Sequence, residues 1–338
     1  MPVCPNCGES VPASAHFCEA CGAELHAVAA ASAVPSTAIG ACVSCGAAAS
    51  SIAADGYCGQ CGMKQPAPGE HREVDLGAVA AVADIGLRHH RNEDAFAIAQ
   101  VDLPDEVVRI IVVCDGVSST ADADLAAQAA ANAACEVLRT VTATDSASFA
   151  RLTTDAIAAA QLAASAIPPK DGVTPSCTIV TAIASISRLP AEFPAQTAAR
   201  AEASVTIGWL GDSRAYWMRG SELRQLSIDD SWAAEQIASG MPEDDAYNDT
   251  RAHTITRWLG ADATELVPHI ETVQVPRPST LLLCSDGLWN YAPTTPALAA
   301  RIAEQGAQSS NLALARALTN FARDAGGHDN ITVALADL

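Results

Sequence analysis

Two apolar segments of this sequence read as buried strands, and each ends on an aspartate followed by glycine. The first, "IIVVCDGVSS" at residues 110–119, reaches Asp115, and the second, "TLLLCSDGLW" at residues 280–289, reaches Asp286. An Asp-Gly pair by itself is a common turn. Two such endings, each directly after a run of buried-strand type, indicate that one place in the fold needs carboxylates.

From Val74 onward the chain alternates between short apolar runs and stretches of helical period. The runs predict strands at 76–83, 95–101, 108–114, 176–186, 204–210, 214–219, 269–275, 279–284 and 330–336. The helical stretches are 122–139, 147–166, 230–239, 295–305 and 310–324. Helices come in pairs between strands and hairpin spacings recur, so the order is not a strict βαβ alternation. We therefore predict an α+β protein with antiparallel sheets covered by helices.

The bulk properties limit the class of protein. A chain of 338 residues that is 49% hydrophobic can form two domains, or one large domain with an appendage. No apolar stretch reaches the ~20 residues that a membrane helix needs, and the start, "MPVCPNCGES", lacks the regions of a signal peptide. We therefore expect a cytoplasmic protein with no membrane partner. The formal net charge of −20 disfavours nucleic acid as a partner, and it also fits carboxylates clustered at a cation site.

Eight of the twelve cysteines lie in one pattern, Cys-x-x-Cys-Gly, which occurs four times near the start of the chain. By spacing they form two groups of four: Cys4, Cys7, Cys18 and Cys21, then Cys42, Cys45, Cys58 and Cys61. Four thiolates make the tetrahedral site that structural zinc prefers, and spans this short need a metal to fold. Disulfides or a redox dithiol are the alternatives, but four glycine-followed copies in a cytosolic chain favour two structural zinc ions.

The domain boundaries follow from composition. We expect a zinc ribbon at 1–24, a linker of small residues at 25–40, a second ribbon at 41–64, a linker at 65–73 and one large domain at 74–338. Residues 1–65 contain one lysine, Lys64, and no arginine, so we expect the ribbons to bind protein or act as spacers rather than to read nucleic acid.

Acidic residues recur at the predicted strand ends of the large domain. They are Glu93 and Asp94, Asp115, Asp212, Asp286 and Asp329. Any one of them alone would read as a turn or cap residue. Taken together, these hard oxygen ligands suit Mg²⁺ or Mn²⁺ rather than zinc. Several carboxylates around two such ions would make a two-metal site that activates water and holds phosphoryl oxygens.

The segments "NEDAF", "VCDGVSS", "GWLGDSRAY", "LLCSDGLWN" and "GHDNITV" occur in the order and spacing of the metal-dependent (PPM, type 2C) Ser/Thr protein phosphatases. The chain resembles this family over about residues 74–338, preceded by a segment that resembles a double zinc ribbon. The resemblance implies a four-layer α-β-β-α sandwich, in which two antiparallel sheets are flanked by helices. It also implies hydrolysis of phosphoserine and phosphothreonine in proteins.

The resemblance also implies roles for the acids. Asp115 would bridge two ions of Mn²⁺ or Mg²⁺, and Gly116 would offer its carbonyl. Asp286 and Asp329 would complete the site of one ion, and Glu93 would support the other. The implied partners are phosphoproteins, together with a cognate bacterial Ser/Thr kinase whose action the enzyme opposes.

Two further acids take roles from the resemblance. Asp94 would order metal-bound water, and Asp212 resembles the residue that holds a third ion with Asp286 in bacterial members. Residues 229–260 resemble the family's mobile flap, whose usual Asp-His pair here reads Asp229-Asp230.

Two positions depart from the family's pattern. The arginine that normally binds phosphate is replaced by His89, and a histidine found in some members is replaced by Val117. Because strand residues alternate faces, His89 and Arg91 should face the cleft and Arg88 should not. We expect His89 and Arg91 to bind the phosphate. These departures leave an alternative function open, a catalytically weak or inactive scaffold that binds signalling proteins.

Overall fold

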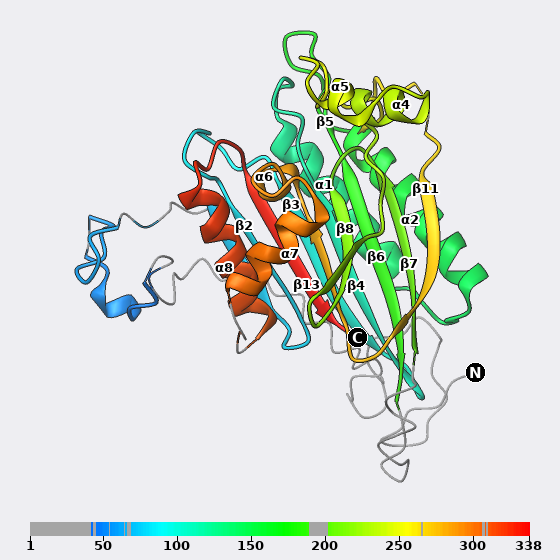
Figure 1. Ribbon diagram of the computed structural model, residues 1–338, viewed down its shortest axis with the longest axis horizontal. Helices are drawn as coiled ribbons and strands as arrows, with labels where there is room; N and C mark the ends of the chain where they lie inside the picture. Colours follow the sequence, from blue (N-terminus) through cyan, green and yellow to red (C-terminus); the bar gives the residue numbers. More distant parts are fainter. Residues whose placement is uncertain are drawn as a thin grey trace, which may run out of the picture. The chain divides into compact units, whose positions relative to one another are not determined.

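The computed structural model of the chain contains two antiparallel β-sheets that face each other, with helices on both outer faces (Figure 1). It describes residues 42, 45–53, 55–63, 65, 69–188, 202–264, 266–305, 308 and 310–338. The predicted first ribbon and its linker lie outside the described residues, as does most of the insertion between β6 and β7.

The first sheet has five strands in the order β11-β7-β6-β4-β3. Their bounds are β11 His269–Pro276, β7 Glu202–Leu210, β6 Ile179–Ser187, β4 Glu106–Cys114 and β3 Ala95–Asp102. A separate two-stranded sheet pairs β5 (Ser176–Cys177) with β10 (Leu259–Gly260). In the sequence, β5 comes directly before β6. The predicted strand at 176–186 is therefore broken at Thr178 into β5 and β6.

The second sheet has six strands in the order β1-β2-β13-β12-β8-β9. Their bounds are β1 His71–Asp75, β2 Val79–Asp84, β13 Ile331–Asp337, β12 Thr280–Cys284, β8 Arg214–Arg219 and β9 Glu222–Gln225. All the pairings are antiparallel. β1 begins at His71, three residues before the predicted start of the domain, because its polar sequence "HREVD" has only one fully buried position and gives little apolar signal.

Three apolar cores separate four layers. One lies between the first sheet and the helices α1 (Ala123–Leu138) and α2 (Ser146–Ser165), and one lies between the two sheets. The third lies between the second sheet and α6 (Asp286–Trp289), α7 (Thr295–Glu304) and α8 (Asn311–Asp324). The predicted α-β-β-α sandwich is confirmed.

Strand β4 shows why these strands read as continuous apolar runs. Val108, Ile110 and Val112 pack toward α1 and α2, whereas Ile111 and Val113 pack between the sheets. Because successive strand residues point to opposite faces, the part of a strand that is covered on both sides is apolar at successive positions, as at residues 110–114 of β4. The acids can follow only where the strand leaves the core.

An ion-pair cluster fixes the edge strand β1 to its neighbours. His71 Nδ1 lies 2.7 Å from Asp84 Oδ2, and His71 Nε2 lies 3.0 Å from Glu73 Oε1. Burial alone would lower the pKa of His71, but hydrogen bonds to the two carboxylates outweigh it and raise the pKa to about 9. Burial would raise the pKa of Glu73, but hydrogen bonds from His71 and Arg316 lower it to about 2.

This cluster predicts a pH-dependent loss of stability in His71→Gln. A raised folded-state pKa stabilises the protein fully below about pH 6.5, and the contribution is lost as the pH rises through about 9. The variant should therefore be less stable than the wild type by roughly 3 kcal/mol at pH 6, and much closer to it at pH 10. Denaturant unfolding at the two pH values measures this. An equal deficit at both would show that His71 acts by packing alone.

The described helices include none with both the length and the hydropathy that crossing a bilayer would require.

Candidate metal centres

The strand registers bring the predicted acids to one end of the two sheets. Ala95 pairs with Cys114 across β3 and β4, so the next residues outward, Asp94 and Asp115, stand opposite each other. In the second sheet, Arg214 pairs with Cys284 across β8 and β12. Asp212 and Asp286 each lie two residues beyond that pair. Asp329 lies two residues before the start of β13, which pairs with β12, so it is at the same end of this sheet.

The acids are close enough to perturb one another. Burial, followed by the charges of Asp94 and Asp286, raises the pKa of Asp115 well above its ordinary value. Burial and the charge of Asp212 do the same for Asp286. Burial raises the pKa of Asp94 and of Asp212 to about 7. Such a group of carboxylates is unfavourable unless protons or cations neutralise it.

Two carboxylate oxygens in this group test whether the residues suit a cation. Asp94 Oδ2 accepts a hydrogen bond from Ser285 Oγ at 2.7 Å, and Asp286 Oδ2 accepts one from Asn290 Nδ2 at 3.0 Å. The other oxygen of each, Oδ1, is buried and has no hydrogen-bond partner among the described residues. A buried, unpaired carboxylate oxygen is costly, and a hard divalent cation would satisfy it, either directly or through a water that the cation holds. The donor set therefore fits Mg²⁺ or Mn²⁺.

Asn330 organises the loop that carries Glu93, and the sequence analysis missed it. Its carboxamide nitrogen donates to the carbonyls of Ile85 and Arg91 at 2.9 and 3.1 Å, and its carboxamide oxygen accepts from Glu93 N at 2.8 Å. Asn330 is only 2% exposed. Its backbone N–H donates to Asp329 Oδ1. An asparagine after a predicted ligand reads as an ordinary turn residue, so no pattern in one sequence marks this role.

Thr178 links two of the acidic turns, and the sequence did not indicate it either. Its N–H donates to Asp115 O at 2.8 Å, and its Oγ1 accepts from Asp115 N at 3.3 Å. The same Oγ1 lies 3.0 Å from Ser213 Oγ, next to Asp212. Both hydroxyls are buried. The turn after β4 and the turn before β8 are therefore held in fixed relation.

Gly116 allows the turn after β4 to approach Glu93. Its N–H donates to Glu93 O at 3.2 Å. A Cβ atom added at Gly116 would lie 2.6 Å from the same oxygen, closer than real Cβ atoms come. The glycine of "DGVS" is therefore required by close packing between two acidic segments.

Residues 85–94 are turn and loop rather than strand, so the predicted alternation of faces is wrong there. The two predicted phosphate-binding residues lie in different surroundings. His89 Nε2 is 3.2 Å from Asp329 Oδ1, at the acidic cluster. Arg91 Nη1 lies 2.8 Å from Asp124 and 3.3 Å from Asp122, at the start of α1. His89 therefore joins the predicted site, whereas Arg91 would have to leave two carboxylates to reach a phosphate there.

A buried cation supports the turn that carries Asp212. Arg214 Nη2 lies 2.7 Å from Asp229 Oδ2, and the guanidinium stacks 3.8 Å above the ring of Trp289. Trp289 Nε1 in turn donates to Asp212 O at 2.9 Å. Arg214 and Trp289 belong to motifs that the resemblance identified, but their contact with each other could not be read from the sequence.

The four described ribbon cysteines form a second candidate centre. The Sγ atoms of Cys42, Cys45, Cys58 and Cys61 all lie within 4.8 Å of one another, and none of the four is in a disulfide. Cys42 Sγ is 3.6 Å from Cys61 Sγ, and Cys45 Sγ is 3.8 Å from Cys58 Sγ. A tetrahedron with Zn–S bonds of about 2.3 Å has S···S edges of about 3.8 Å, so the donors fit zinc. Cys4, Cys7, Cys18 and Cys21 lie outside the described residues.

We expect the purified chain to carry about two zinc ions. Cys42→Ser should lower the zinc content to about one, because three thiolates and a hydroxyl bind zinc more weakly than four thiolates. Elemental analysis measures this. Cys135→Ser, which changes a buried cysteine of α1, is the matched control and should retain both ions. Full zinc content in Cys42→Ser would contradict the assignment.

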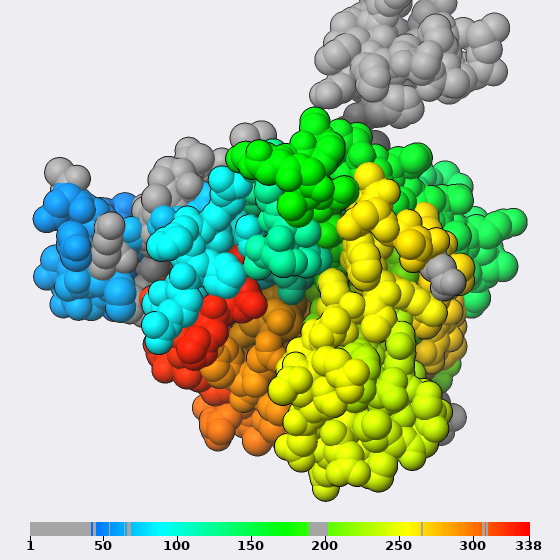
Figure 2. Space-filling model, turned by 90° about the horizontal axis from the view of Figure 1, so that it is seen from above, coloured from blue at the N-terminus to red at the C-terminus, as the bar shows by residue number. Residues whose placement is uncertain are grey.

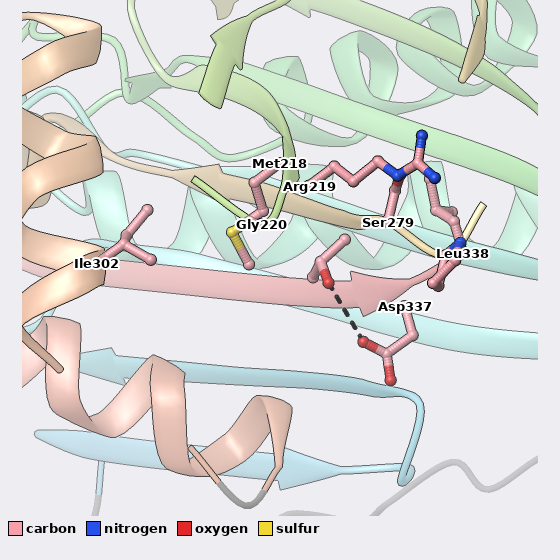
Figure 3. A pocket seen from close by; sticks show the side chains of 9 residues that line it. Met218, Arg219, Gly220, Ser279, Ile302, Asp337 and Leu338 are labelled. Atoms are coloured by element: carbon pink, nitrogen blue, oxygen red, sulfur yellow. Dashed lines mark hydrogen bonds between the residues drawn. The ribbon is translucent and has the colours of Figure 1, made fainter. Parts of the chain in front are cut away.

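A hollow of about 390 Å³ lies at the opposite ends of β8, β12 and β13 from the acidic site (Figure 3). Figure 3 shows Met218 and Ile302 on one side of it and Arg219, Ser279 and Leu338 on the other. Asp337 also lines the hollow, and its carboxylate accepts a hydrogen bond from Thr280 Oγ1. None of the predicted site residues lines this hollow. The candidate catalytic site is therefore the group of acids at the other end of the strands.

Comparison with known proteins finds relatives in sequence and in fold. The curated serine/threonine phosphatase stp of Listeria welshimeri is 35% identical over 143 residues, which cover 40% of this chain and 53% of that protein. The chain thus spans about half the length of the curated relatives it matches. Among solved structures, the Streptococcus agalactiae serine/threonine phosphatase covers 76% of this chain, with 97% of its own chain aligned, a TM-score of 0.59 and 23% identity.

A second solved structure has the same fold. The catalytic domain of the phosphatase PstP, in complex with two manganese ions, covers 77% of this chain, with 96% of its own chain aligned, a TM-score of 0.54 and 23% identity. The sequence model of the double zinc ribbon matches residues 4–62, which contain the eight patterned cysteines. The model of protein phosphatase 2C matches residues 88–321, more than half of the chain and all the acidic turns except the last. The chain therefore belongs to the protein phosphatase 2C family.

Proposed function

We propose that this chain is a protein Ser/Thr phosphatase that depends on Mn²⁺ or Mg²⁺. The observation that carries the proposal is the group of half-buried and buried carboxylates at one end of both sheets, whose pKa values loss of solvent and mutual repulsion raise. Family membership and the curated relatives, which are named as Ser/Thr phosphatases, support it. The PstP structure with two manganese ions supports the choice of metal.

The residues that would hold the metals are the acids of the strand ends. We propose that Asp115 would help to hold both ions and that Gly116 would offer its carbonyl, with Asp286 and Asp329 on one ion and Glu93 on the other. Asp212 would hold a third ion together with Asp286. When bound, the divalent cations would supply positive charge that lowers the pKa of water and neutralises phosphoryl oxygens.

The chain's own residues would orient the water and bind the phosphate. We propose that Asp94, fixed through Oδ2 by Ser285, uses Oδ1 to order water held at the cations. His89, beside Asp329, would donate a hydrogen bond to the phosphate. Arg91 stays a predicted phosphate ligand, but its contacts with Asp122 and Asp124 make His89 the stronger candidate.

The experiment compares hydrolysis of a phosphothreonine peptide by the full chain with Mn²⁺, with Mg²⁺ and with a chelator. We expect turnover only with a divalent cation. The absence of turnover with either metal, for protein that is folded and retains its zinc, would favour the alternative of an inactive scaffold that binds signalling proteins. Direct binding of the peptide would then separate a scaffold from a chain with no such ligand.

The zinc ribbons are proposed as a docking or regulatory module. The proposed ribbons, 1–24 and 41–64, are joined by one linker, and a second linker, 65–73, leads to the phosphatase domain. Strand β1 begins at His71, inside that second proposed linker. The phosphoprotein substrates, the opposing kinase and the cytoplasmic location also remain proposals.

A further inference from the structure

The side chain of Gln65, beyond the last cysteine of the second ribbon, contacts one of the four candidate zinc ligands. The described residues of this ribbon are blue in Figure 2. Gln65 Nε2 donates a hydrogen bond to Cys42 Sγ at 3.3 Å, across 23 positions of sequence. Gln65 is only 5% exposed, and Cys42 is only 3% exposed. Composition assigned Gln65 to the linker 65–73, but these contacts join it to the ribbon.

The orientation of the Gln65 carboxamide follows from a second contact. Its Nε2 also lies 3.1 Å from the carbonyl oxygen of Met63. A carbonyl oxygen can only accept hydrogen bonds, so the nitrogen of the carboxamide, rather than its oxygen, must face Met63. The same nitrogen carries a second hydrogen, which is available to Cys42 Sγ. Gln65 therefore presents a donor to the sulfur.

The backbone holds Gln65 in this place. Its N–H donates to Gly56 O at 2.7 Å, and Cys58 N–H donates to Met63 O at 2.8 Å. These two bonds close a short hairpin that carries the second cysteine pair of the ribbon. Cys42 belongs to the first pair. The backbone of Gln65 is thus fixed to one cysteine pair, while its side chain reaches the other.

A donor at this sulfur has a clear use when zinc is bound. Four thiolates around one Zn²⁺ leave two negative charges in excess, in a chain whose net charge is already −20. A buried anionic sulfur is stabilised by an N–H donor, and donors beside a metal ligand also fix the direction in which the ligand points.

We propose that Gln65 is a positioning residue for zinc, whose carboxamide N–H orients Cys42 and stabilises its thiolate. This inference goes beyond the proposed phosphatase function and rests on the assignment of zinc to the four cysteines.

Gln65→Met and Gln65→Glu test the proposal. Methionine has about the same length but no N–H donor, and glutamate has the same shape but places a carboxylate at the sulfur. We expect the ion that is lost in Cys42→Ser to bind about 10- to 100-fold more weakly in Gln65→Met, and more weakly still in Gln65→Glu. Competition with a chelator, carried out on the full chain, measures these affinities. The other zinc ion is an internal standard and should keep its affinity.

Replacement of zinc by Co²⁺ gives a second measurement, which distinguishes a hydrogen bond from packing. The sulfur-to-cobalt charge-transfer band should move to longer wavelength in Gln65→Met. The reason is that a thiolate that loses an N–H donor holds its electrons less tightly.

The matched control is Gln60→Met, the same change at an exposed glutamine of the same ribbon. It should keep both zinc affinities and the cobalt spectrum. Unchanged affinity in Gln65→Met would overturn the proposal, and so would equal weakening of both ions. A weaker ion with an unchanged band would also overturn it, because Gln65 would then act by packing. A wild type that holds no zinc would overturn the proposal together with the zinc assignment, whatever its phosphatase activity.

Discussion

Replacing Asp286 with asparagine should lower Mn²⁺-dependent turnover of a phosphopeptide by about a thousandfold or more, because several kcal/mol of charge stabilisation depend on the metal. Asp286 is a half-buried acid whose pKa is raised by loss of solvent and by Asp212, and its buried Oδ1 atom has no hydrogen-bond partner among the described residues. Asparagine keeps the size but removes the charge that a divalent cation needs. Steady-state kinetics on purified, folded protein measure the loss.

The same variant should separate function from stability. Without metal, Asp286→Asn should be at least as stable as the wild type, since it removes one of several mutually repelling carboxylates. With Mn²⁺ the wild type should gain thermal stability and the variant should gain little. Asp324→Asn, an exposed change at the end of α8, is the control and should behave as wild type. Near-normal turnover in folded Asp286→Asn would rule out the metal assignment.

The stabilisation of the wild type by Mn²⁺ should also depend on pH. The raised pKa values of about 7 mean that the metal-free folded protein keeps protons on Asp94 and Asp212 that the unfolded chain would release. These protons favour the folded state at low pH, and that contribution is lost as the pH rises through about 7. Metal must displace them, so the gain in melting temperature should be smaller at pH 5.5 than at pH 8.

Gly287→Ala should destabilise the phosphatase domain more than most surface or helix substitutions. A Cβ atom at Gly287 would lie 1.9 Å from Asn330 O and 2.8 Å from Asn330 C. The overlap is with backbone, which cannot rotate away, so the start of β13 must shift. We expect a loss of about 3 kcal/mol, near the upper end for overpacking, and a fall in melting temperature of about 6–12 °C. Calorimetry measures it.

The shift should also impair metal binding, because Gly287 adjoins Asp286 and Asn330 adjoins Asp329. Gly220→Ala provides the comparison. Gly220 has a positive φ of 59° but no atom within 4 Å of an added Cβ, so this variant should lose only about 1 kcal/mol from backbone strain. Similar losses in the two variants would show that contact with Asn330 does not govern the effect.

Several features of the fold followed directly from local pattern. Continuous apolar runs such as "IIVVC" predicted strands that are buried on both faces, and β4 and β12 are such strands. The Cys-x-x-Cys-Gly spacing grouped Cys42 and Cys45 with Cys58 and Cys61, as the structure does. These predictions depend on periodicity and on the short reach of a tight turn, which are properties of neighbouring residues.

Other elements carried too little local signal. β1 and β9 are short, polar edge strands, and each pairs with a single neighbour on an exposed margin of the sheet. The region predicted as a helix at 230–239 contains α4 (Trp232–Ala238) but begins with Ser231 as its cap, because Asp230 is engaged with Gly211 and His269 instead. Contacts far apart in the sequence determined these boundaries.

The sequence by itself determined which residues are candidate metal ligands, because several acids that each follow or precede a strand, and four cysteine pairs at tight spacing, form patterns that single turn residues do not explain. Only the tertiary structure decided how they are held. Asn330 reaches Glu93 across 237 positions of sequence, and Ser285 reaches Asp94 across 191. In the tertiary structure Arg91 contacts Asp122 and Asp124, whereas His89 lies beside Asp329. The physical reason is that a hydrogen bond depends on distance and direction in space, and strand register, which the chain settles only on folding, sets both.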